Sequence, residues 1–167
     1  MITATVTILS FVYTFGIAFL LGVGPKEYDA EWYKSLRKPS WSVPDLVFPI
    51  VFPIFYLCEG IALARILLKS DLVSSLIPLT LFLAATILSA SWSRCFFAKK
   101  RCDIALLIFA IELVLNWLVV WLFWGVDWLS GLLMLPVSFW SLYAITVNFG
   151  FLKLNKRFWK SCGNFTF

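Results

Sequence analysis

Three polar residues interrupt long apolar runs of the sequence, and their side chains have the greatest capacity for chemistry. Glu59 lies in an apolar run that starts near Leu46, whereas Glu112 and Asn116 lie in a run that starts near Ile104. At about 1.5 Å per residue, Glu59 and Asn116 reach similar depths of roughly 20 Å, so they could hydrogen-bond if their helix faces meet. Such groups form a polar floor to a cavity or a proton site. The alternative is an interhelical clamp with neutral carboxyls.

Metal chemistry and histidine-based catalysis are disfavoured by composition. The sequence has no histidine, which is the commonest metal and haem ligand and the usual general base at neutral pH. Its four cysteines form no CxxC pair: Cys58, Cys95, Cys102 and Cys162. We therefore expect no metal site, no disulfide framework and no required cofactor.

Aromatic and polar side chains from separate apolar runs are expected near one end of the protein. Phe52, Trp92 and Asn148 each lie about two turns or less from the same end of a different run, and Ser89 lies one turn deeper than Trp92. A charged, aromatic loop precedes the run that contains Phe52. A cavity of this kind under a basic loop suits a flat apolar ligand with anionic edges, although plain core packing would use the same aromatic residues.

These side chains must be positioned by membrane helices. The chain of 167 residues is 62% hydrophobic and 14% charged, against about 25% charged in a typical soluble domain. Several apolar runs approach the length of about 20 residues that crosses a bilayer. The sequence thus predicts an all-α integral membrane protein with a single domain over residues 1–167. Its five transmembrane helices are expected at about 3–23, 46–68, 72–97, 104–126 and 132–152, with a lid-like first loop at about 24–45 that contains a short helix from Ala30 to Leu36.

Basic residues are distributed unevenly between the two ends of this bundle. The first loop, the loop after the third helix and the C-terminal segment carry twelve of the fourteen Lys and Arg residues. By the positive-inside rule, the first loop and the C-terminus are cytoplasmic and the N-terminus is outside, as in a bacterial inner membrane. This topology accounts for the net charge of +5, so the expected partner is the lipid bilayer and not nucleic acid. The first helix is expected to be retained, not cleaved as a signal.

Three further patterns concern the helix surfaces. A tryptophan stripe in the fourth helix predicts a lipid-facing aromatic belt or, alternatively, a ligand platform; its members are Trp117, Trp121, Trp124 and Trp128. Ala85, Ser89 and Ser93 form a ridge of small residues that permits close helix approach or a homodimer through the third helix. Arg65 is expected to extend toward the membrane interface.

Three motifs resemble the tryptophan-rich sensory protein / translocator protein family, also called the peripheral benzodiazepine receptor family. The first is WYKSLRKPSW at Trp32–Trp41, followed by a proline-rich helix start and by Tyr56-x-x-x-Gly60. The second is WSRCFF at Trp92–Phe97, and the third is Pro136-x-x-x-Trp140 with Asn148 two turns later. Their order and spacing agree over nearly the whole chain.

The resemblance implies a five-helix bundle, often dimeric, whose first loop covers a pocket for porphyrins. Family members also bind sterols and benzodiazepine-type ligands. The predicted ligand-binding residues in the helices and at the loop motif are Trp41, Phe48, Val51, Phe52, Tyr56, Ser89, Trp92, Phe96, Trp140, Ala144 and Asn148. We add Lys34, Arg37 and Lys38 of the first loop as partners for porphyrin propionates.

The sequence also departs from the family pattern. Phe52 stands where the family usually has a tryptophan that porphyrin-degrading members use together with the one matching Trp140. Ser89 replaces an asparagine, and the sterol-recognition pattern lacks its tyrosine before Lys153, so sterol binding is not supported.

We therefore expect a receptor or carrier for tetrapyrroles such as porphyrin or haem-type ligands, acting as a sensor or regulator of tetrapyrrole metabolism or stress. A porphyrin-degrading enzyme is one alternative. A structural or interaction protein without a small-molecule ligand is another.

Overall fold

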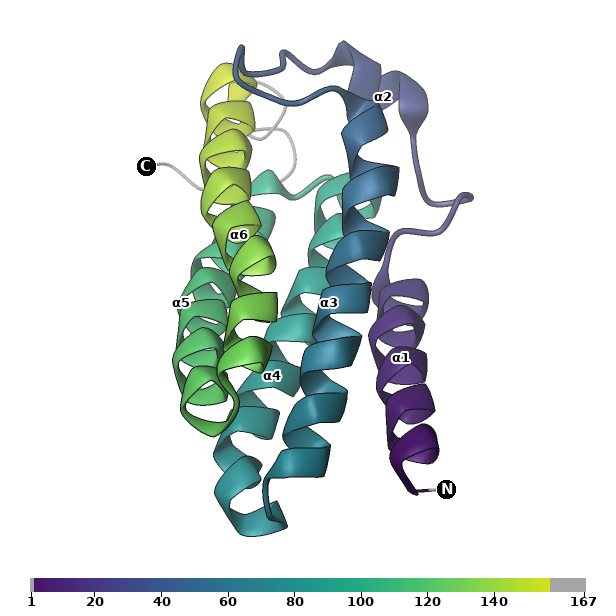
Figure 1. Cartoon of the computed structure of the whole chain (residues 1–167). Coiled ribbons are helices and arrows are strands. Elements are labelled where there is room, and N and C mark those ends of the chain that lie inside the picture. Colours follow the sequence, from purple (N-terminus) through teal and green to yellow (C-terminus); the bar gives the residue numbers. More distant parts are fainter. Residues whose placement is uncertain (1, 157–167) are drawn as a thin grey trace.

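The computed structural model describes residues 2–156, except for the side chain of Leu72. Five long helices and one short one make up the fold (Figure 1): α1 (Ile2–Leu21), α2 (Ala30–Ser35), α3 (Phe48–Lys69), α4 (Leu72–Ser93), α5 (Cys102–Val126) and α6 (Trp128–Leu154). A 3-10 turn, η1 (Asp45–Val47), leads into α3, and a π-helical turn, η2 (Arg94–Ala98), ends α4. All five long helices are long and apolar enough to cross a membrane. The predicted all-α, five-helix membrane fold is confirmed. Arg157, Lys160 and Cys162, which entered the predictions, lie outside the described residues.

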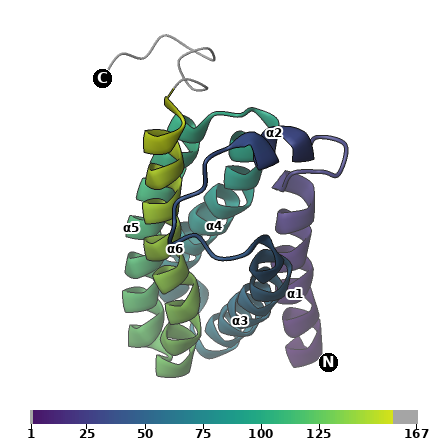
Figure 2. The ribbon, with the colours of Figure 1, turned by 90° about the horizontal axis from the view of Figure 1, so that it is seen from above.

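The long helices form a closed ring. α1 packs against α3 and α4, α3 also packs against α6, and α5 lies between α6 and α4. Loop 1, which we define as residues 22–47 with α2 and η1, crosses one end of this ring from α2 toward α6 and back to α3 (Figure 2). We call this the loop end and the opposite one the far end.

Two clusters of buried residues close the ring at different levels. The far-end cluster joins α3, α4, α5 and α6, and consists of Ala62, Leu63, Ile66, Phe82, Val119, Val120, Phe123 and Met134. The loop-end cluster joins loop 1 to α4, α5 and α6 through Tyr33, Leu36, Phe96, Cys102, Ala105 and Phe151. The space for a site lies between the two clusters.

A single residue, Asp127, makes the turn between α5 and α6. Its backbone N–H donates to the Phe123 carbonyl (2.8 Å), and its carboxylate accepts from the backbone N–H (3.1 Å) and the hydroxyl (2.7 Å) of Ser130. This carboxylate therefore caps α6 directly. For that reason α6 starts at Trp128, four residues before the predicted start at residue 132.

Asp127 also binds two cations from the end of α3. Arg65 donates through Nε (2.7 Å) and Nη2 (3.0 Å), and Lys69 Nζ lies 2.5 Å from the same carboxylate. The Arg65 hydrogen bonds, with those of Lys69 and Ser130, hold the pKa of the Asp127 carboxyl well below its ordinary value. The expected extension of Arg65 toward the interface stays a prediction; its guanidinium reaches Asp127, which lies between the two membrane-spanning helices α5 and α6 at the far end.

The exposure of side chains on α4, α5 and α6 bears on two of the predicted surface patterns, the tryptophan stripe and the ridge of small residues. All four tryptophans of the stripe are exposed on the outside of α5 and at the start of α6, with Trp121 78% exposed. This exposure favours the lipid-facing interpretation, which stays a prediction. The small-residue ridge of α4 instead faces inward: Ala85 is buried, and Ser93 Oγ accepts from the Val23 N–H (3.0 Å). A homodimer stays a prediction, and one that used α4 would need its outer face near Val73 and Ile77.

The contacts of Asp127 predict a specific stability effect. Asp127→Asn keeps a capping side chain but removes the charge that Arg65 and Lys69 bind, so we expect it to lower the unfolding temperature in detergent micelles by roughly 5 °C. Because the pKa is lowered in the folded state, this contribution is present at neutral pH and is lost as the pH falls below about 4. The difference between wild type and Asp127→Asn should accordingly shrink in acid.

Asp71→Asn is the matched control. Asp71 caps α4 by accepting from the N–H groups of Val73 and Ser74, both at 3.0 Å, and no Lys or Arg pairs with it within residues 2–156. Circular dichroism during heating should show almost no shift for this variant. Equal shifts for the two variants would contradict the role assigned to the cations.

Candidate functional site

Loop 1 is held to α6 through its own backbone. The Asn155 side chain accepts from the Arg37 N–H (2.8 Å) and donates to the Arg37 carbonyl (2.9 Å). The Tyr143 hydroxyl accepts from the Val43 N–H (2.8 Å) and donates to the Trp41 carbonyl (3.1 Å). These four hydrogen bonds satisfy backbone groups that lack partners in a helix, and they fix the path of the loop across the bundle end.

The Lys-Pro-Ser-Trp block packs on a glycine of α6. A Cβ atom placed on Gly150 would lie 2.5 Å from Pro39 Cγ and 3.0 Å from Trp41 Cζ2. Only a residue without a side chain permits this close approach. The proline and tryptophan of this motif thus seat loop 1 on the helix.

Ion pairs fasten the other half of loop 1 to the corner between α4 and α5. Lys100 binds Asp29 (2.8 Å), and Arg94 binds Glu27 (3.3 Å). Asp29 also caps α2 by accepting from the Trp32 N–H (2.9 Å), and Lys100 together with this cap lowers the pKa of the Asp29 carboxyl. Exposed pairs of this kind contribute little individually, so the buried contacts of the loop dominate its attachment.

An enclosed cavity of about 40 Å³ lies directly beneath loop 1. Rings from α2, α3, α4, η2, α5 and α6 surround it, together with a few small or polar side chains. Its lining residues are Tyr33, Phe48, Phe52, Trp92, Phe96, Phe97, Phe109, Trp140, Tyr143, Ala144, Val147, Asn148 and Phe151. Trp140 meets Phe48 and Phe52 at ring-centroid distances of 5.7 and 6.0 Å, and Trp92 meets Phe109 at 4.9 Å.

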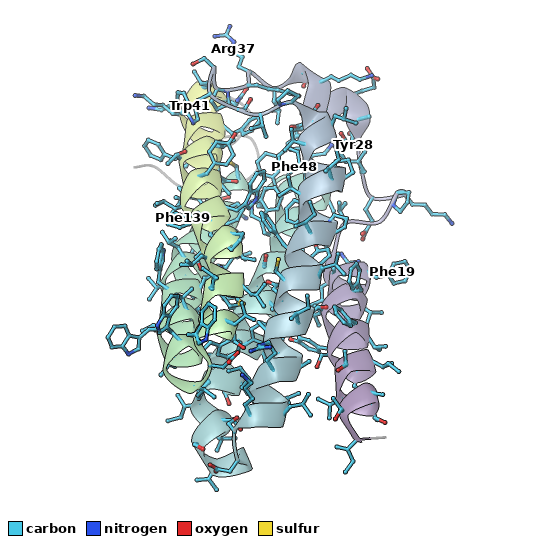
Figure 3. All side chains as sticks on the ribbon, in the orientation of Figure 1. Phe19, Tyr28, Arg37, Trp41, Phe48 and Phe139 are labelled. Atoms are coloured by element: carbon cyan, nitrogen blue, oxygen red, sulfur yellow. The ribbon has the colours of Figure 1, made fainter. Side chains whose placement is uncertain are left out.

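A larger groove of about 500 Å³ adjoins this cavity on the side of α1. Ala18 of α1, Gly22 of loop 1, Tyr56 of α3, and Ser89 and Ala90 of α4 contribute to its wall. Five rings line both the cavity and the groove, and we call them the aromatic partition: Tyr33, Phe48, Phe52, Trp92 and Phe97. Phe48 points inward between the helices, whereas Phe19 of α1 points away from the bundle (Figure 3).

The structure brings most of the predicted ligand-binding residues together. Nine line the cavity or the groove: Phe48, Phe52, Tyr56, Ser89, Trp92, Phe96, Trp140, Ala144 and Asn148. Val51 lines neither space, and Trp41 is exposed and packs outside the cavity against α6. Ligand binding by these residues stays a prediction.

The three basic residues predicted for propionates do not line either space. Lys34 pairs with Glu31 (3.3 Å), and Arg37 points away from the bundle (Figure 3). Lys38 binds Asp45 (2.7 Å) and lies 4.4 Å from the centre of the Tyr33 ring. The Tyr33 hydroxyl donates to the same Asp45 carboxylate (3.0 Å), and burial followed by the Asp45 charge raises the pKa of Tyr33.

The amide of Asn148 is already used within the protein. It donates to the Cys102 carbonyl (3.0 Å), and its oxygen accepts from Trp92 Nε1 (3.3 Å). Asn148 thus orients Trp92 and ties α6 to the start of α5. These bonds use one of the two amide N–H groups and one lone pair of the amide oxygen.

Glu59 and Glu112 form a floor below the aromatic residues. Both line a small space of about 10 Å³, together with Tyr56, Ser89, Trp92 and Trp140 among others. Asn116 and Ser141 both donate to Glu112 Oε1, at 3.2 and 3.1 Å. The hydrogen bond expected between Glu59 and Asn116 is not present among the described residues, because Asn116 faces Glu112 and Ser141. The predicted polar floor and the predicted clamp are both seen in part, since Glu112 bridges α5 and α6 and lines the small space below the cavity.

Several lining residues were not predicted for the site. Tyr33, Phe97 and Tyr143 line the cavity, and so does Phe109 of α5. Tyr143 lies one turn after Trp140 on the same helix face, which is a signal that sequence reasoning could have used. Phe97 follows Phe96 directly, and both reach the cavity from the π-helical turn, whose wider spacing a sequence does not reveal.

Comparisons with known proteins agree with the resemblance carried by the motifs. A model of the TspO/MBR family matches residues 6–154. "Protein CrtK" of Rhodobacter capsulatus is 35% identical over 129 residues, which cover 74% of this chain and 78% of that protein. "Tryptophan-rich sensory protein" of Cereibacter sphaeroides is 30% identical over 125 residues, covering 75% and 77%. "Tryptophan-rich protein TspO" of Chlorobaculum tepidum is 31% identical over 159 residues, covering 89% and 97%.

The attachment of loop 1 to α6 predicts a local change in dynamics. Tyr143→Phe removes two hydrogen bonds, each contributing about 1 kcal/mol, so the segment around Val43 should open about thirtyfold more often. Hydrogen–deuterium exchange should then be faster in residues 37–45 and unchanged in the far-end cluster.

Tyr28→Phe is the matched control for this change. Tyr28 also lies in loop 1, contacts the rings of Tyr33 and Phe97, and its hydroxyl makes no hydrogen bond within the described part of the chain. This variant should exchange like the wild type. Unchanged exchange in Tyr143→Phe would show that the hydroxyl does not hold the loop.

Proposed function

The chain belongs to the TspO/MBR family, and on this premise we propose that it is a multi-pass membrane receptor or carrier that binds a tetrapyrrole beneath loop 1. The observation that carries the proposal is the convergence of aromatic rings from loop 1, α3, α4 and α6 around one covered space. Flat conjugated ligands are recognised by such rings through stacking and edge contacts. A relative named as a sensory protein supports a sensing or regulatory role.

The sizes of the two spaces indicate where such a ligand would lie. The enclosed cavity of about 40 Å³ is far below the roughly 300–1,000 Å³ of typical ligand pockets, whereas the groove of about 500 Å³ falls within that range. The ligand would therefore occupy the groove. Rotation of Phe48 and Phe52 in the aromatic partition would allow a ligand in the groove to contact Trp140 as well.

Charge distribution supports a bacterial inner-membrane location for the protein. Loop 1 and the α4–α5 corner lie at the loop end, where eight Lys and Arg residues are found, whereas Arg65 and Lys69 lie at the far end. The proposed orientation places the loop end in the cytoplasm and the N-terminus outside.

Orientation can be tested by cysteine labelling. In a variant without native cysteines, a membrane-impermeant maleimide applied to intact spheroplasts should label Ser74→Cys and leave Lys34→Cys unlabelled. Both positions are exposed at opposite ends of the bundle, so each serves as the control for the other. The reverse pattern would contradict the proposed orientation.

Ligand binding can be tested with protoporphyrin IX in nanodiscs, by following the absorbance band of the porphyrin. Trp140→Ala removes a ring at the cavity, and Ala18→Phe fills the groove without removing a contact. Each should weaken binding about tenfold or more. The matched controls Trp121→Ala and Ala4→Phe make the same changes on exposed helix faces and should bind like the wild type.

Two results would contradict the proposal. Binding that does not saturate, or that all four variants change equally, would show that the porphyrin partitions into the lipid or binds elsewhere. Protein-dependent loss of the absorbance band under light would instead favour the porphyrin-degrading alternative, in which Phe52 replaces the expected tryptophan.

A further inference from the structure

All the charged residues that line the cavity, the groove and the floor are acidic. They are Asp45 at the mouth of the groove and Glu59 and Glu112 at the floor, and no Lys or Arg of residues 2–156 lines any of the three spaces. Lys38 neutralises Asp45 at the mouth. Neither glutamate forms an ion pair within residues 2–156, so the deep end of the pocket carries carboxyls without a cation.

One oxygen at the floor lacks a hydrogen-bond donor. Glu112 is 1% exposed, and its Oε1 accepts from Asn116 and Ser141. Its Oε2 is buried and has no hydrogen bond of good geometry among the described residues, although the Ser89 hydroxyl is close enough to interact with the Glu112 carboxyl. A buried carboxyl oxygen without a donor is costly, particularly within a membrane, and a donor brought by a ligand would offset that cost.

The space at the floor limits what can enter. Its volume of about 10 Å³ accommodates a group of about the size of one water molecule. Phe52 and Trp92 line the floor, the cavity and the groove alike, so a ligand held between these rings can direct one small group at the glutamates. Aromatic faces also attract cations, which adds to the effect of the carboxyls.

We infer that Glu59 and Glu112 select a flat aromatic ligand that carries a hydrogen-bond donor, such as a protonated amine or a ring N–H, at its deepest end. An anionic group is disfavoured there and would remain at the mouth of the groove. The inference rests on the proposed pocket but is independent of the tetrapyrrole assignment, because it concerns which end of a ligand the pocket accepts.

Three probes of similar size and shape test this selection: 9-aminoacridine, which is a cation, acridine, which is neutral, and anthracene-9-carboxylate, which is an anion. Binding is measured to the protein in nanodiscs of phosphatidylcholine, with empty nanodiscs subtracted. The wild type should bind 9-aminoacridine about tenfold or more tightly than anthracene-9-carboxylate. Glu112→Gln and Glu59→Gln, which keep the side-chain shape, should each reduce this preference about tenfold, while the affinity for acridine stays nearly unchanged.

Glu31→Gln is the matched control, because Glu31 is exposed on α2 and far from the floor. It should keep the wild-type preference. Equal affinity of the wild type for the cation and the anion would overturn the inference even if a Gln variant fails to fold. An undiminished preference in both Gln variants would also overturn it.

Protoporphyrin IX titrated into the same samples separates this inference from the proposed function. Porphyrin binding without a charge preference would overturn the inference alone. A charge preference that depends on the glutamates, in a protein that does not bind porphyrin, would support the inference and contradict the tetrapyrrole assignment.

Discussion

The irregular backbone of loop 1 imposes the constraint on which the site depends. A loop that crosses the end of a membrane bundle must find partners for its N–H and C=O groups without forming a helix or a sheet. Asn155 and Tyr143 of α6 supply them, and Gly150 between these residues leaves room for Pro39 and Trp41. The C-terminal half of α6 and its capping residue Asn155 thus determine the path of the loop. The placement of Tyr33 over the cavity follows from that path.

The apolar runs were sufficient to predict the five helices, because crossing a bilayer demands about 20 apolar residues and few charges. Their ends were less predictable. Asp127 ends one helix and caps the next, so the turn that the sequence suggested at residues 127–130 is reduced to one residue. The π-helical turn at Arg94–Ala98 depends on tertiary packing and leaves no clear sequence pattern.

At the site, the position of a residue along its helix predicted its level in the bundle but not the side chain that it contacts. Phe52, Trp92 and Asn148 were expected at one end of the bundle, and they line one cavity there. Distance along a helix does not determine which partner a side chain meets. Lys38 therefore turns to Asp45, and Asn116 turns to Glu112, although the sequence suggested a ligand for the first and Glu59 for the second. Pocket geometry of this kind requires the three-dimensional arrangement.

The attachment of Asp127 to α3 also bears on how the chain assembles. A one-residue turn makes α5 and α6 a helical hairpin, and in the proposed orientation its tip has to cross to the outer side. Moving a lone carboxylate through hydrocarbon is costly. Arg65 and Lys69 precede Asp127 in the chain, so they are synthesised first and are already available when the hairpin arrives. Because of this order along the chain, the two cations that bind Asp127 are made before the carboxylate itself.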